Sequence, residues 1–240
     1  MSTTTSEKNA AYYEQLYQSH ADPWDYVQAA EQAKYRLSLE AARRWQPAPQ
    51  RILEVACSLG YLTEQLAGYA PEVYAFDVSE TAVRQTRQRC ARLNTPTRFD
   101  IRPGDALEPD YPAGHFDVIF AGDVVHGAFD GSELSIRAVR ALLPLLASGG
   151  VLVLTDYIQP ADQAGYERLV VNQGAQVLEK LYFHDRYWFR LKNALKFMEK
   201  TRVAQWFLRS RAVYQFLKKP ATWRGPQGSK HFGLVVQRKQ

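Results

Sequence analysis

From residue 51 onward, short apolar stretches alternate with amphipathic ones, and this alternation limits the chain to few folds. The apolar stretches predict strands at 51–55, 72–77, 97–102, 116–121, 149–157, 176–184 and 230–238. The amphipathic stretches predict helices at 60–69, 79–93, 132–146 and 161–173. Strands that alternate with helices form a parallel sheet with helices on both faces. The sequence therefore predicts an α/β, Rossmann-like fold with a seven-stranded, mainly parallel sheet.

The segment before the first strand predicts a helical cover. We expect ordered structure to begin near Ala11, with helices at 11–19 and 29–45 that the turn Asp22-Pro23-Trp24 separates. The predicted organisation has four parts, which are an N-terminal helical lid (1–48), a cofactor-binding core (49–185), a basic amphipathic helical insertion (186–229) and a final core strand (230–240).

Composition excludes several classes of protein. A chain of 240 residues with 46% hydrophobic residues is long enough for one large core. Its apolar runs, such as 151–154, are far shorter than the roughly 20 residues of a membrane-spanning helix. Cys57 and Cys90 are the only cysteines, and no paired Cys or His spacing indicates a disulfide framework or a metal site. Because residues 1–10 are also polar, unlike a signal peptide, we expect a cytoplasmic protein without a metal.

Charge is distributed unevenly along the chain. The formal net charge is +5, but the chain from Arg186 onward has 14 Lys and Arg against one acid, and the rest has 16 bases against 24 acids. Within 186–229 the bases alternate with apolar residues at helical spacing, which predicts amphipathic helices. Such helices pack on the protein body, cover a substrate, lie on an anionic membrane or contact nucleic-acid phosphates. We expect an acidic or lipid-linked substrate, or peripheral contact of 186–229 with the anionic inner face of a membrane. Nucleic acid is the less favoured partner.

Small residues follow the first predicted strand, in Arg51-Ile-Leu-Glu-Val-Ala-Cys-Ser-Leu-Gly60. Small residues let the backbone approach a ligand, and the start of the next helix offers unpaired N–H groups. Ala56 and Ser58 stand where a dinucleotide-binding loop has its first two glycines. The loop by itself is therefore also consistent with an ordinary strand-to-helix turn.

Carboxylates follow the next two strands. Asp77 ends the second strand, where a carboxylate can accept hydrogen bonds from two ribose hydroxyls. Asp105, in Gly104-Asp105-Ala106, follows the third strand, where an adenine amino group would donate to it. A lone Asp after a strand is more commonly a helix cap or turn residue. The order of the two carboxylates after successive strands is what indicates a nucleoside site.

These residues, with Phe116-Asp-Val-Ile119 and Gly149-Gly150, resemble the class I S-adenosylmethionine-dependent methyltransferases over roughly 50–185 and 230–238. The resemblance implies S-adenosylmethionine as cofactor and S-adenosylhomocysteine as product. It implies that the methionine part of the cofactor lies against the first loop, that Asp77 holds the ribose and that Asp105 flanks the adenine. Ala56 and Ser58 depart from the glycines of the family pattern. The cofactor-binding residues expected are Trp24, Tyr35, Glu54, Ala56, Cys57, Gly60, Asp77, Val78, Asp105, Ala106, Asp123 and Val124.

A second resemblance precedes the first strand. Asp22-Pro-Trp-Asp-Tyr26, followed by Glu31-x-x-Lys34-Tyr35, resembles the NodS-like branch, whose founding members N-methylate a sugar amine of nodulation oligosaccharides. This resemblance implies that the N-terminal helices fold over the cofactor and that Trp24, Lys34 and Tyr35 close the pocket. The alternative is that Trp24 and Tyr35 are core aromatics under a lid helix.

The loop after the fourth strand contains the predicted catalytic residues, Asp123 and His126. It lies at the carboxyl edge of the sheet, where ligands bind in such folds. Methylation of a hydroxyl or an ammonium group needs a base within hydrogen-bond reach. His126 titrates near neutral pH and Asp123 suits an amine. Both also fit plain structural roles, Asp123 as a cap and His126 in a loop hydrogen bond, and Tyr157 and Asp156 are weaker candidates at the same edge.

The sequence thus predicts a methyltransferase that acts on N or O of a small molecule or saccharide. An RNA methyltransferase is an alternative that the basic insertion favours. It is weakened because the sequence shows no separate RNA-binding module, and because no Asn or Asp followed by Pro-Pro-Tyr comes after the fourth strand. A third hypothesis is a protein that binds the cofactor without turnover. The acceptor, the choice between N and O, and the oligomeric state stay open.

Overall fold

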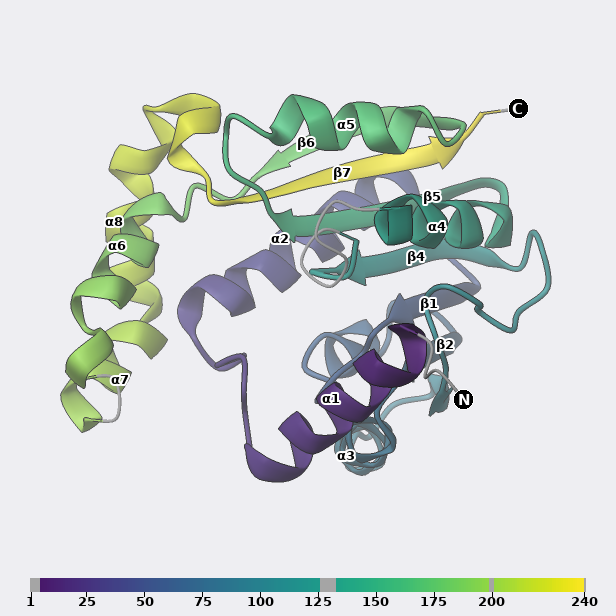
Figure 1. Ribbon diagram of the computed structural model, residues 1–240, viewed down its shortest axis with the longest axis horizontal. Coiled ribbons are helices and arrows are strands. Elements are labelled where there is room, and N and C mark those ends of the chain that lie inside the picture. Colours follow the sequence, from purple (N-terminus) through teal and green to yellow (C-terminus); the bar gives the residue numbers. More distant parts are fainter. Residues whose placement is uncertain (1–4, 126–132, 199–200, 240) are drawn as a thin grey trace.

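The structure, a computed structural model, describes residues 5–125, 133–198 and 201–239, with side chains from Ala10 onward. Its centre is a seven-stranded sheet in the order β3-β2-β1-β4-β5-β7-β6 (Figure 1). Strands β1 to β5 are parallel, and β7 runs antiparallel to both β5 and β6. The predicted Rossmann-like, mainly parallel fold is confirmed. The strands are β1 (Arg51–Val55), β2 (Glu72–Asp77), β3 (Arg98–Pro103), β4 (Phe116–Gly122), β5 (Leu146–Tyr157), β6 (Ala175–Tyr182) and β7 (His231–Arg238).

Helices cover both faces of this sheet and extend beyond one end of it. The α-helices are α1 (Thr5–Ser19), α2 (Ala29–Trp45), α3 (Glu80–Cys90), α4 (Glu133–Leu142), α5 (Gln163–Val171), α6 (Arg186–Ala194), α7 (Arg202–Arg209) and α8 (Arg211–Thr222). Short 3-10 turns are η1 (Thr63–Leu66), η2 (Leu143–Leu145), η3 (Lys196–Met198) and η4 (Gly225–Gly228). The helical insertion expected before the last strand therefore consists of α6, α7 and α8 with their connecting turns. None of the described helices is long and apolar enough to cross a membrane.

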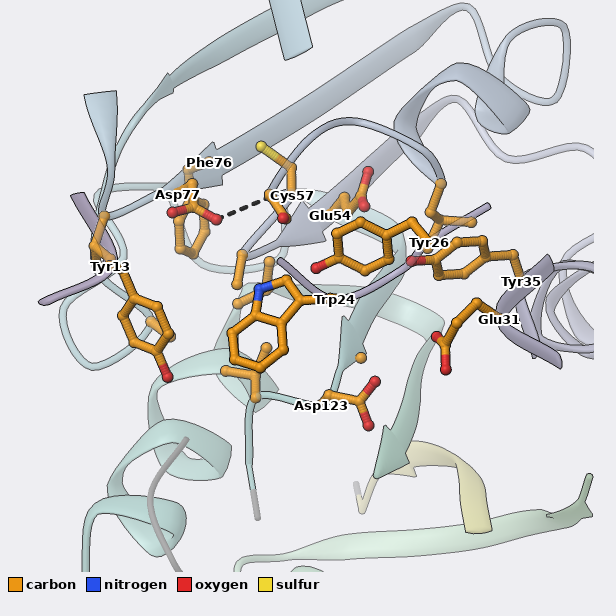
Figure 2. A pocket seen from close by; sticks show the side chains of 18 of the residues that line it. Tyr13, Trp24, Tyr26, Glu31, Tyr35, Glu54, Cys57, Phe76, Asp77 and Asp123 are labelled. Atoms are coloured by element: carbon orange, nitrogen blue, oxygen red, sulfur yellow. Dashed lines mark hydrogen bonds between the residues drawn. The ribbon is translucent and has the colours of Figure 1, made fainter. Parts of the chain in front are cut away.

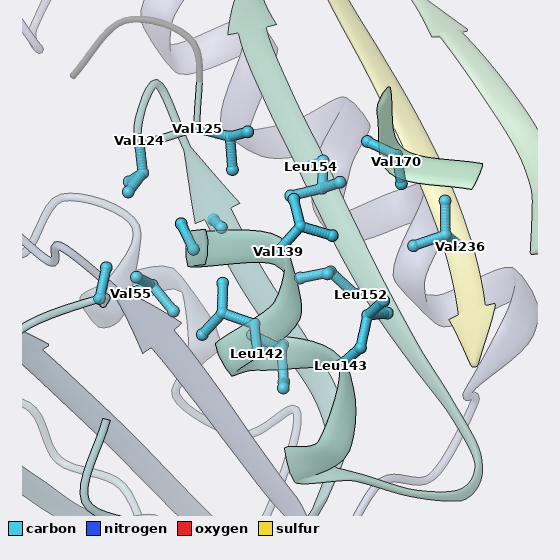
Figure 3. Close-up of a cluster of buried hydrophobic side chains, with 14 of the residues drawn as sticks. Val55, Val124, Val125, Val139, Leu142, Leu143, Leu152, Leu154, Val170 and Val236 are labelled. Atoms are coloured by element: carbon cyan, nitrogen blue, oxygen red, sulfur yellow. The ribbon is translucent and has the colours of Figure 1, made fainter. Parts of the chain in front are cut away.

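The central strands are buried on both faces, which explains their continuous apolar sequences. In β5, Leu152 and Leu154 pack against α4 and α5, in a cluster that includes Val139 (Figure 3). The alternate residues Val151 and Val153 pack on the opposite face, in the cluster that contains α2. A strand that packs on both faces reads as an apolar run rather than as an alternating pattern. Burial of each such side chain contributes about 1.5 to 3 kcal/mol to folding.

Some element boundaries differ from the predicted ones. The predicted helix at 60–69 is wrong, because only the 3-10 turn Thr63–Leu66 forms there. Gly60 and Gly68 have φ values of +76° and +77°, and this left-handed conformation interrupts a helix at both ends of the segment. The first helix begins at Thr5 rather than near Ala11, because the polar residues that precede Ala11 include good helix formers. Strand β5 begins at Leu146 rather than at residue 149, because Leu146 already pairs with β4.

The insertion packs on the start of α2. Trp188 of α6, Leu208 of α7 and Tyr214 of α8 are buried in one cluster with Ala29 and Ala33. The hydroxyl of Tyr214 also donates a hydrogen bond of 3.0 Å to the carbonyl oxygen of residue 183. The inner faces of the insertion are therefore fixed to the N-terminal helices.

Strand direction decides which residues meet at the carboxyl edge of the sheet. Strands β1 to β5 end at this edge, and β6 ends there too because it runs parallel to β5. Strand β7 begins there, and its first residue, His231, pairs with Tyr157 at the end of β5. One edge therefore gathers the ends of six strands and the start of the seventh.

Candidate functional site

A cavity of about 480 Å³ lies at this edge. Its volume falls within the range of small-molecule sites. The N-terminal segment closes one side and α6 contributes to another. Of the predicted cofactor residues, all except Gly60 line it. The lining residues include Tyr13, Tyr17, Trp24, Tyr26, Glu31, Lys34, Tyr35, Glu54, Ala56, Cys57, Asp77, Val78, Asp105, Ala106, Asp123, Val124, Tyr157, Phe189 and His231.

The loop after β1 keeps a glycine-like shape although it has few glycines. Ala56 and Ser58 have φ values of 54° and 51°, in the left-handed region that glycine prefers. Each such residue costs about 1 to 2 kcal/mol relative to ordinary backbone. Gly60 does not line the cavity. Glycine is needed there for the turn, since a Cβ at this position would lie 2.7 Å from Cγ2 of Thr86 on α3. The loop thus has the backbone path of a glycine-rich loop and side chains that line or cap the cavity.

Asp77 ties this loop to the end of β2. Its two carboxylate oxygens accept hydrogen bonds from the backbone N–H groups of Ser58, at 2.9 Å, and Ser79, at 3.0 Å. Burial raises the pKa of Asp77 to about 6. Each carboxylate oxygen has more than one lone pair, so Asp77 retains the capacity to accept from ribose hydroxyls. Asp105, on the next strand end, accepts a bond of 2.8 Å from the N–H of Leu107.

The N-terminal segment is hydrogen-bonded to the same loop. The hydroxyl of Tyr17 bonds that of Ser58 at 2.6 Å, and the indole N–H of Trp24 donates to Tyr17 at 3.2 Å. Glu14 accepts bonds from the hydroxyls of Ser79 and Thr81 at the start of α3, and these bonds lower its pKa to about 2. In Figure 2, Trp24 lies between Asp77 on one side and the Glu31 and Tyr35 side chains on the other. The lid thus contacts the loop through side-chain bonds that the sequence pattern did not reveal.

The chemistry of the lining fits a cationic ligand. Among the described residues that line the cavity, five are carboxylates, those of Glu31, Glu54, Asp77, Asp105 and Asp123, against the ammonium of Lys34. The rings of Tyr13, Tyr17, Trp24, Tyr26 and Tyr35 form much of the remaining wall. Carboxylates and aromatic faces both attract cations. The residues therefore fit S-adenosylmethionine, whose sulfonium and ammonium groups are positive.

Binding of S-adenosylmethionine is expected to release a proton from Glu54. Burial raises the pKa of Glu54 to about 8, although the Thr63 hydroxyl, which donates to it at 2.6 Å, opposes the shift. A bound cation favours the carboxylate, so affinity should rise with pH up to about pH 8 and then level off. Between pH 7 and pH 8 we expect a gain of about fivefold.

Titration calorimetry in buffers of different ionisation enthalpy measures this proton directly. The Glu54→Gln variant is the matched control, because it keeps the shape and cannot titrate. It should release fewer protons and show a weaker pH dependence than the parent chain. Equal proton release from both proteins would show that Glu54 is already ionised.

A buried lysine links the lid to the loop after β4. The Nζ of Lys34 bonds Asp123 and lies 2.8 Å from Glu31, and the Lys34 side chain is only 4% exposed. Burial alone would lower the pKa of Lys34, but Asp123 and Glu31 outweigh burial and raise it. Burial would likewise raise the pKa of Asp123, but Lys34 and His231 hold it below its usual value. Asp123 has a φ of 55°, a strained conformation of the kind found at functional sites.

His231 forms a second buried pair at the same end of the cavity. Its Nδ1 lies 2.6 Å from the carboxylate of Asp185, and its Nε2 lies 3.8 Å from Asp123. Burial and Lys34 would lower the pKa of His231, but the Asp185 hydrogen bond and the nearby carboxylates raise it above 6.5. Asp185 also accepts bonds from the backbone N–H groups of Lys230 and His231. The imidazole is therefore held in one orientation on the cavity wall.

The predicted catalytic residues differ from one another in where they lie in the structure. Asp123 lines the cavity, and His126 lies outside the described residues. Tyr157 lines the cavity too, whereas Asp156 accepts a bond of 2.5 Å from Tyr166 on α5 and is not part of the wall. Neither His231 nor Asp185 was predicted from the sequence. His231 could have been found from the predicted last strand, because an antiparallel last strand places its first residue at the carboxyl edge of its neighbours.

Comparisons with known proteins find methyltransferases. Residues 52–150 match the methyltransferase domain family. The 27-O-demethylrifamycin SV methyltransferase of Amycolatopsis mediterranei is 29% identical over 121 residues, which cover 50% of this chain and 43% of that protein. The protein-L-isoaspartate O-methyltransferase of Halorhodospira halophila is 32% identical over 125 residues, which cover 51% and 49%. The chain spans about half the length of these curated relatives.

Solved structures share the fold over more of the chain. The N-methyltransferase NodS from Bradyrhizobium japonicum WM9, in complex with S-adenosylhomocysteine, has a TM-score of 0.65 and 16% identity, covering 97% of this chain and 100% of that chain. The [4+2]-cyclase SpnF has a TM-score of 0.64 and 18% identity, covering 87% and 83%. The matched residues 52–150 and the shared fold identify a methyltransferase domain with a Rossmann-like fold. Its cofactor is S-adenosylmethionine.

Proposed function

We propose that the protein transfers a methyl group from S-adenosylmethionine to a nitrogen or oxygen atom of a small molecule or saccharide. The observation that carries this proposal is one continuous cavity with two different ends. One end has Asp77 and Asp105, which suit the nucleoside of the cofactor. The other end has His231 and Tyr157, which suit an acceptor and its proton.

The acceptor end is largely aromatic. The rings of Tyr157, Phe189 and His231 form a triangle with centroid distances of 5.3 to 5.5 Å. Tyr157 comes from β5, His231 from β7 and Phe189 from α6 of the insertion. Aromatic faces of this kind bind the flat or apolar side of a sugar or ring compound. We infer that the insertion helps to select the acceptor.

His231 is proposed as the catalytic base. When bound, the cofactor supplies an electrophilic methyl group, so the chain has to position the acceptor and accept its proton. With Nδ1 donating to Asp185, the Nε2 of His231 has the lone pair that takes this proton. Asp185 is the positioning residue, which selects the tautomer and stabilises the imidazolium. Asp123, held by Lys34, is placed to orient an acceptor amine or hydroxyl.

We further propose membership of the NodS-like branch and an acidic or lipid-linked acceptor. Support for the branch comes from Trp24, Lys34 and Tyr35, which line the cavity as the sequence resemblance implies. Support for the acceptor comes from the charge of the chain from Arg186 onward, which has 14 bases and one acid. This segment begins with α6, the helix that contributes Phe189 to the cavity wall. The small-molecule acceptor remains compatible with either N- or O-methylation.

Methyl transfer itself is tested with isotope-labelled S-adenosylmethionine. The full chain is incubated with fractionated cell extract, and labelled products are identified by mass spectrometry. We expect label in a small-molecule, saccharide or lipid-linked fraction, at a level that His231→Gln sharply reduces. Label confined to RNA would replace the proposal with the RNA methyltransferase alternative. Intact binding of S-adenosylhomocysteine without any transfer would identify a binding protein or a different reaction on this fold.

A further inference from the structure

Large apolar side chains are exposed in one segment, between residues 197 and 223. The exposed fractions reach 101% for Phe197, 87% for Trp223, 74% for Phe216 and 63% for Trp206. Elsewhere in the described chain, the exposed large apolar residues are Tyr12, Trp24, Trp45 and Tyr157, and two of these line the cavity. Scattered single apolar residues need no explanation, but a concentration of this kind marks an interaction surface.

Helix α7 has two apolar faces, and only one is used within the protein. Ala204 and Leu208, at i and i+4, are fully buried. Val203, Trp206 and Phe207, at i, i+3 and i+4, share another face and are exposed. The buried stripe already anchors the helix on its neighbours. Packing therefore does not account for the second stripe.

Helix α8 repeats this arrangement. Tyr214 and Ala221 are buried, whereas Phe216 is exposed, and the exposed Trp223 follows the end of the helix. The three helices α6, α7 and α8 stand together at one side of the molecule, away from most of the sheet (Figure 1). The outer side of this group is therefore open to a partner.

The charges around these aromatic residues favour one kind of partner. The exposed basic residues of the same segment are Lys196, Arg202, Arg209, Arg211, Lys219 and Arg224. The chain from Arg186 onward has 14 bases and one acid, so two copies that met through this surface would repel each other. An anionic lipid surface instead attracts the bases, while Trp and Phe side chains settle at the level of the headgroups.

We propose that residues 196–198 and 201–224 dock on an anionic lipid surface and insert Trp206, Phe216 and Trp223 at its interface. This docking does not depend on methyl transfer. Docking also presents a lipid-linked acceptor to the cavity, and this second statement rests on the proposed function. Because Phe189 of α6 lines the cavity, docking brings the acceptor end close to the lipid surface, as a lipid-linked acceptor requires.

Vesicle flotation of the full chain tests the docking. We expect the parent protein to float with phosphatidylcholine–phosphatidylglycerol vesicles and to stay in solution with phosphatidylcholine alone. The Trp206→Ser/Phe216→Ser/Trp223→Ser variant should bind the mixed vesicles at least about tenfold more weakly. An Arg202→Gln/Arg211→Gln/Lys219→Gln variant should lose about 100-fold at low salt, and its binding should respond less to added salt.

Trp45→Ser is the matched control, because it removes an exposed tryptophan outside the segment and should float like the parent. All variants should bind S-adenosylhomocysteine with parent affinity, which shows that they are folded. The proposal is overturned if the parent does not float with either vesicle, or if the triple Ser variant floats equally well. It is also overturned if the segment holds two copies of the chain together in a dimer that the triple Ser variant dissociates. The same applies if the protein binds RNA and does not bind vesicles. Methylation of a water-soluble acceptor would be unaffected by these outcomes, so the two proposals fail separately.

Discussion

Replacing His231 with glutamine should lower the rate of methyl transfer by about 100- to 10,000-fold, the usual contribution of a general base. Glutamine keeps much of the shape of the imidazole but cannot accept the proton from the acceptor. Affinity for S-adenosylhomocysteine should stay close to that of the parent, because His231 lies at the other end of the cavity from Asp77 and Asp105. Single-turnover kinetics and calorimetry on the same preparations measure the two quantities.

The dependence of the rate on pH distinguishes a base from a merely structural histidine. Burial and Lys34 lower the pKa of His231, but Asp185 and Asp123 outweigh them and raise it above 6.5. At saturating S-adenosylmethionine, where the titration of Glu54 no longer limits cofactor binding, kcat/KM for the acceptor should therefore rise with pH through a pKa above 6.5 and then level off, once His231 is neutral. The Gln variant should lack this rise.

Asp185→Asn provides the corresponding test of the positioning residue. This change removes the negative charge that raises the pKa of His231 and keeps the size of the side chain. We expect a slower enzyme whose rate levels off at a lower pH than that of the parent. Parent-like rates in both variants would exclude the pair, and His126→Ala and Asp123→Ala would then test the residues that the sequence indicated.

Replacing Lys34 with methionine should lower the free energy of unfolding by about 3 kcal/mol. The change leaves the carboxylates of Glu31 and Asp123 facing each other without the ammonium that neutralises them. We expect the low end of the range for a broken buried pair, because the Asp123 side chain is 40% exposed toward the cavity. Urea unfolding followed by tryptophan fluorescence measures the loss.

A double variant separates the charge effect from the loss of packing. Lys34→Met/Asp123→Asn should be more stable than Lys34→Met alone, because the unpaired carboxylate is gone. The deficit of the single variant should also shrink as pH falls, since protonation of the carboxylates removes the repulsion. A single variant within about 0.5 kcal/mol of the parent would show that these ion pairs contribute little to stability.

Much of the fold was predictable because its signals are local. Strands buried on both faces read as apolar runs, and the helices between them read as amphipathic segments. Boundaries failed where a pair of glycines or a pairing partner decided the end, as at Gly60, Gly68 and Leu146, and at the start of α1, where polar helix formers extend the helix to Thr5. The meeting of Asp77 and Asp105 at the cavity was predictable too, because each follows a strand directly and parallel strands end at one edge.

The acceptor end was not predictable in the same way. His231, Asp185 and Lys34 lie far apart in the chain, and nothing in the local sequence marks His231 or Asp185, whereas Lys34 was expected only to close the pocket. Their meeting depends on β7 entering the sheet between β5 and β6, and on the lid helix α2 reaching the loop after β4. Neither contact leaves a periodicity that a single segment can show.

The sequence by itself determined the class of fold, because the alternation of strands and helices is read from the chain one segment at a time, and the resemblance to class I methyltransferases implied the cofactor. The sequence also determined the asymmetry of charge between body and insertion. Only the tertiary structure decided which described histidine lines the cavity, which cation pairs with Asp123 and which apolar residues of the insertion remain exposed. Those properties depend on pairing register and burial between distant segments, and burial exists only once the chain has folded.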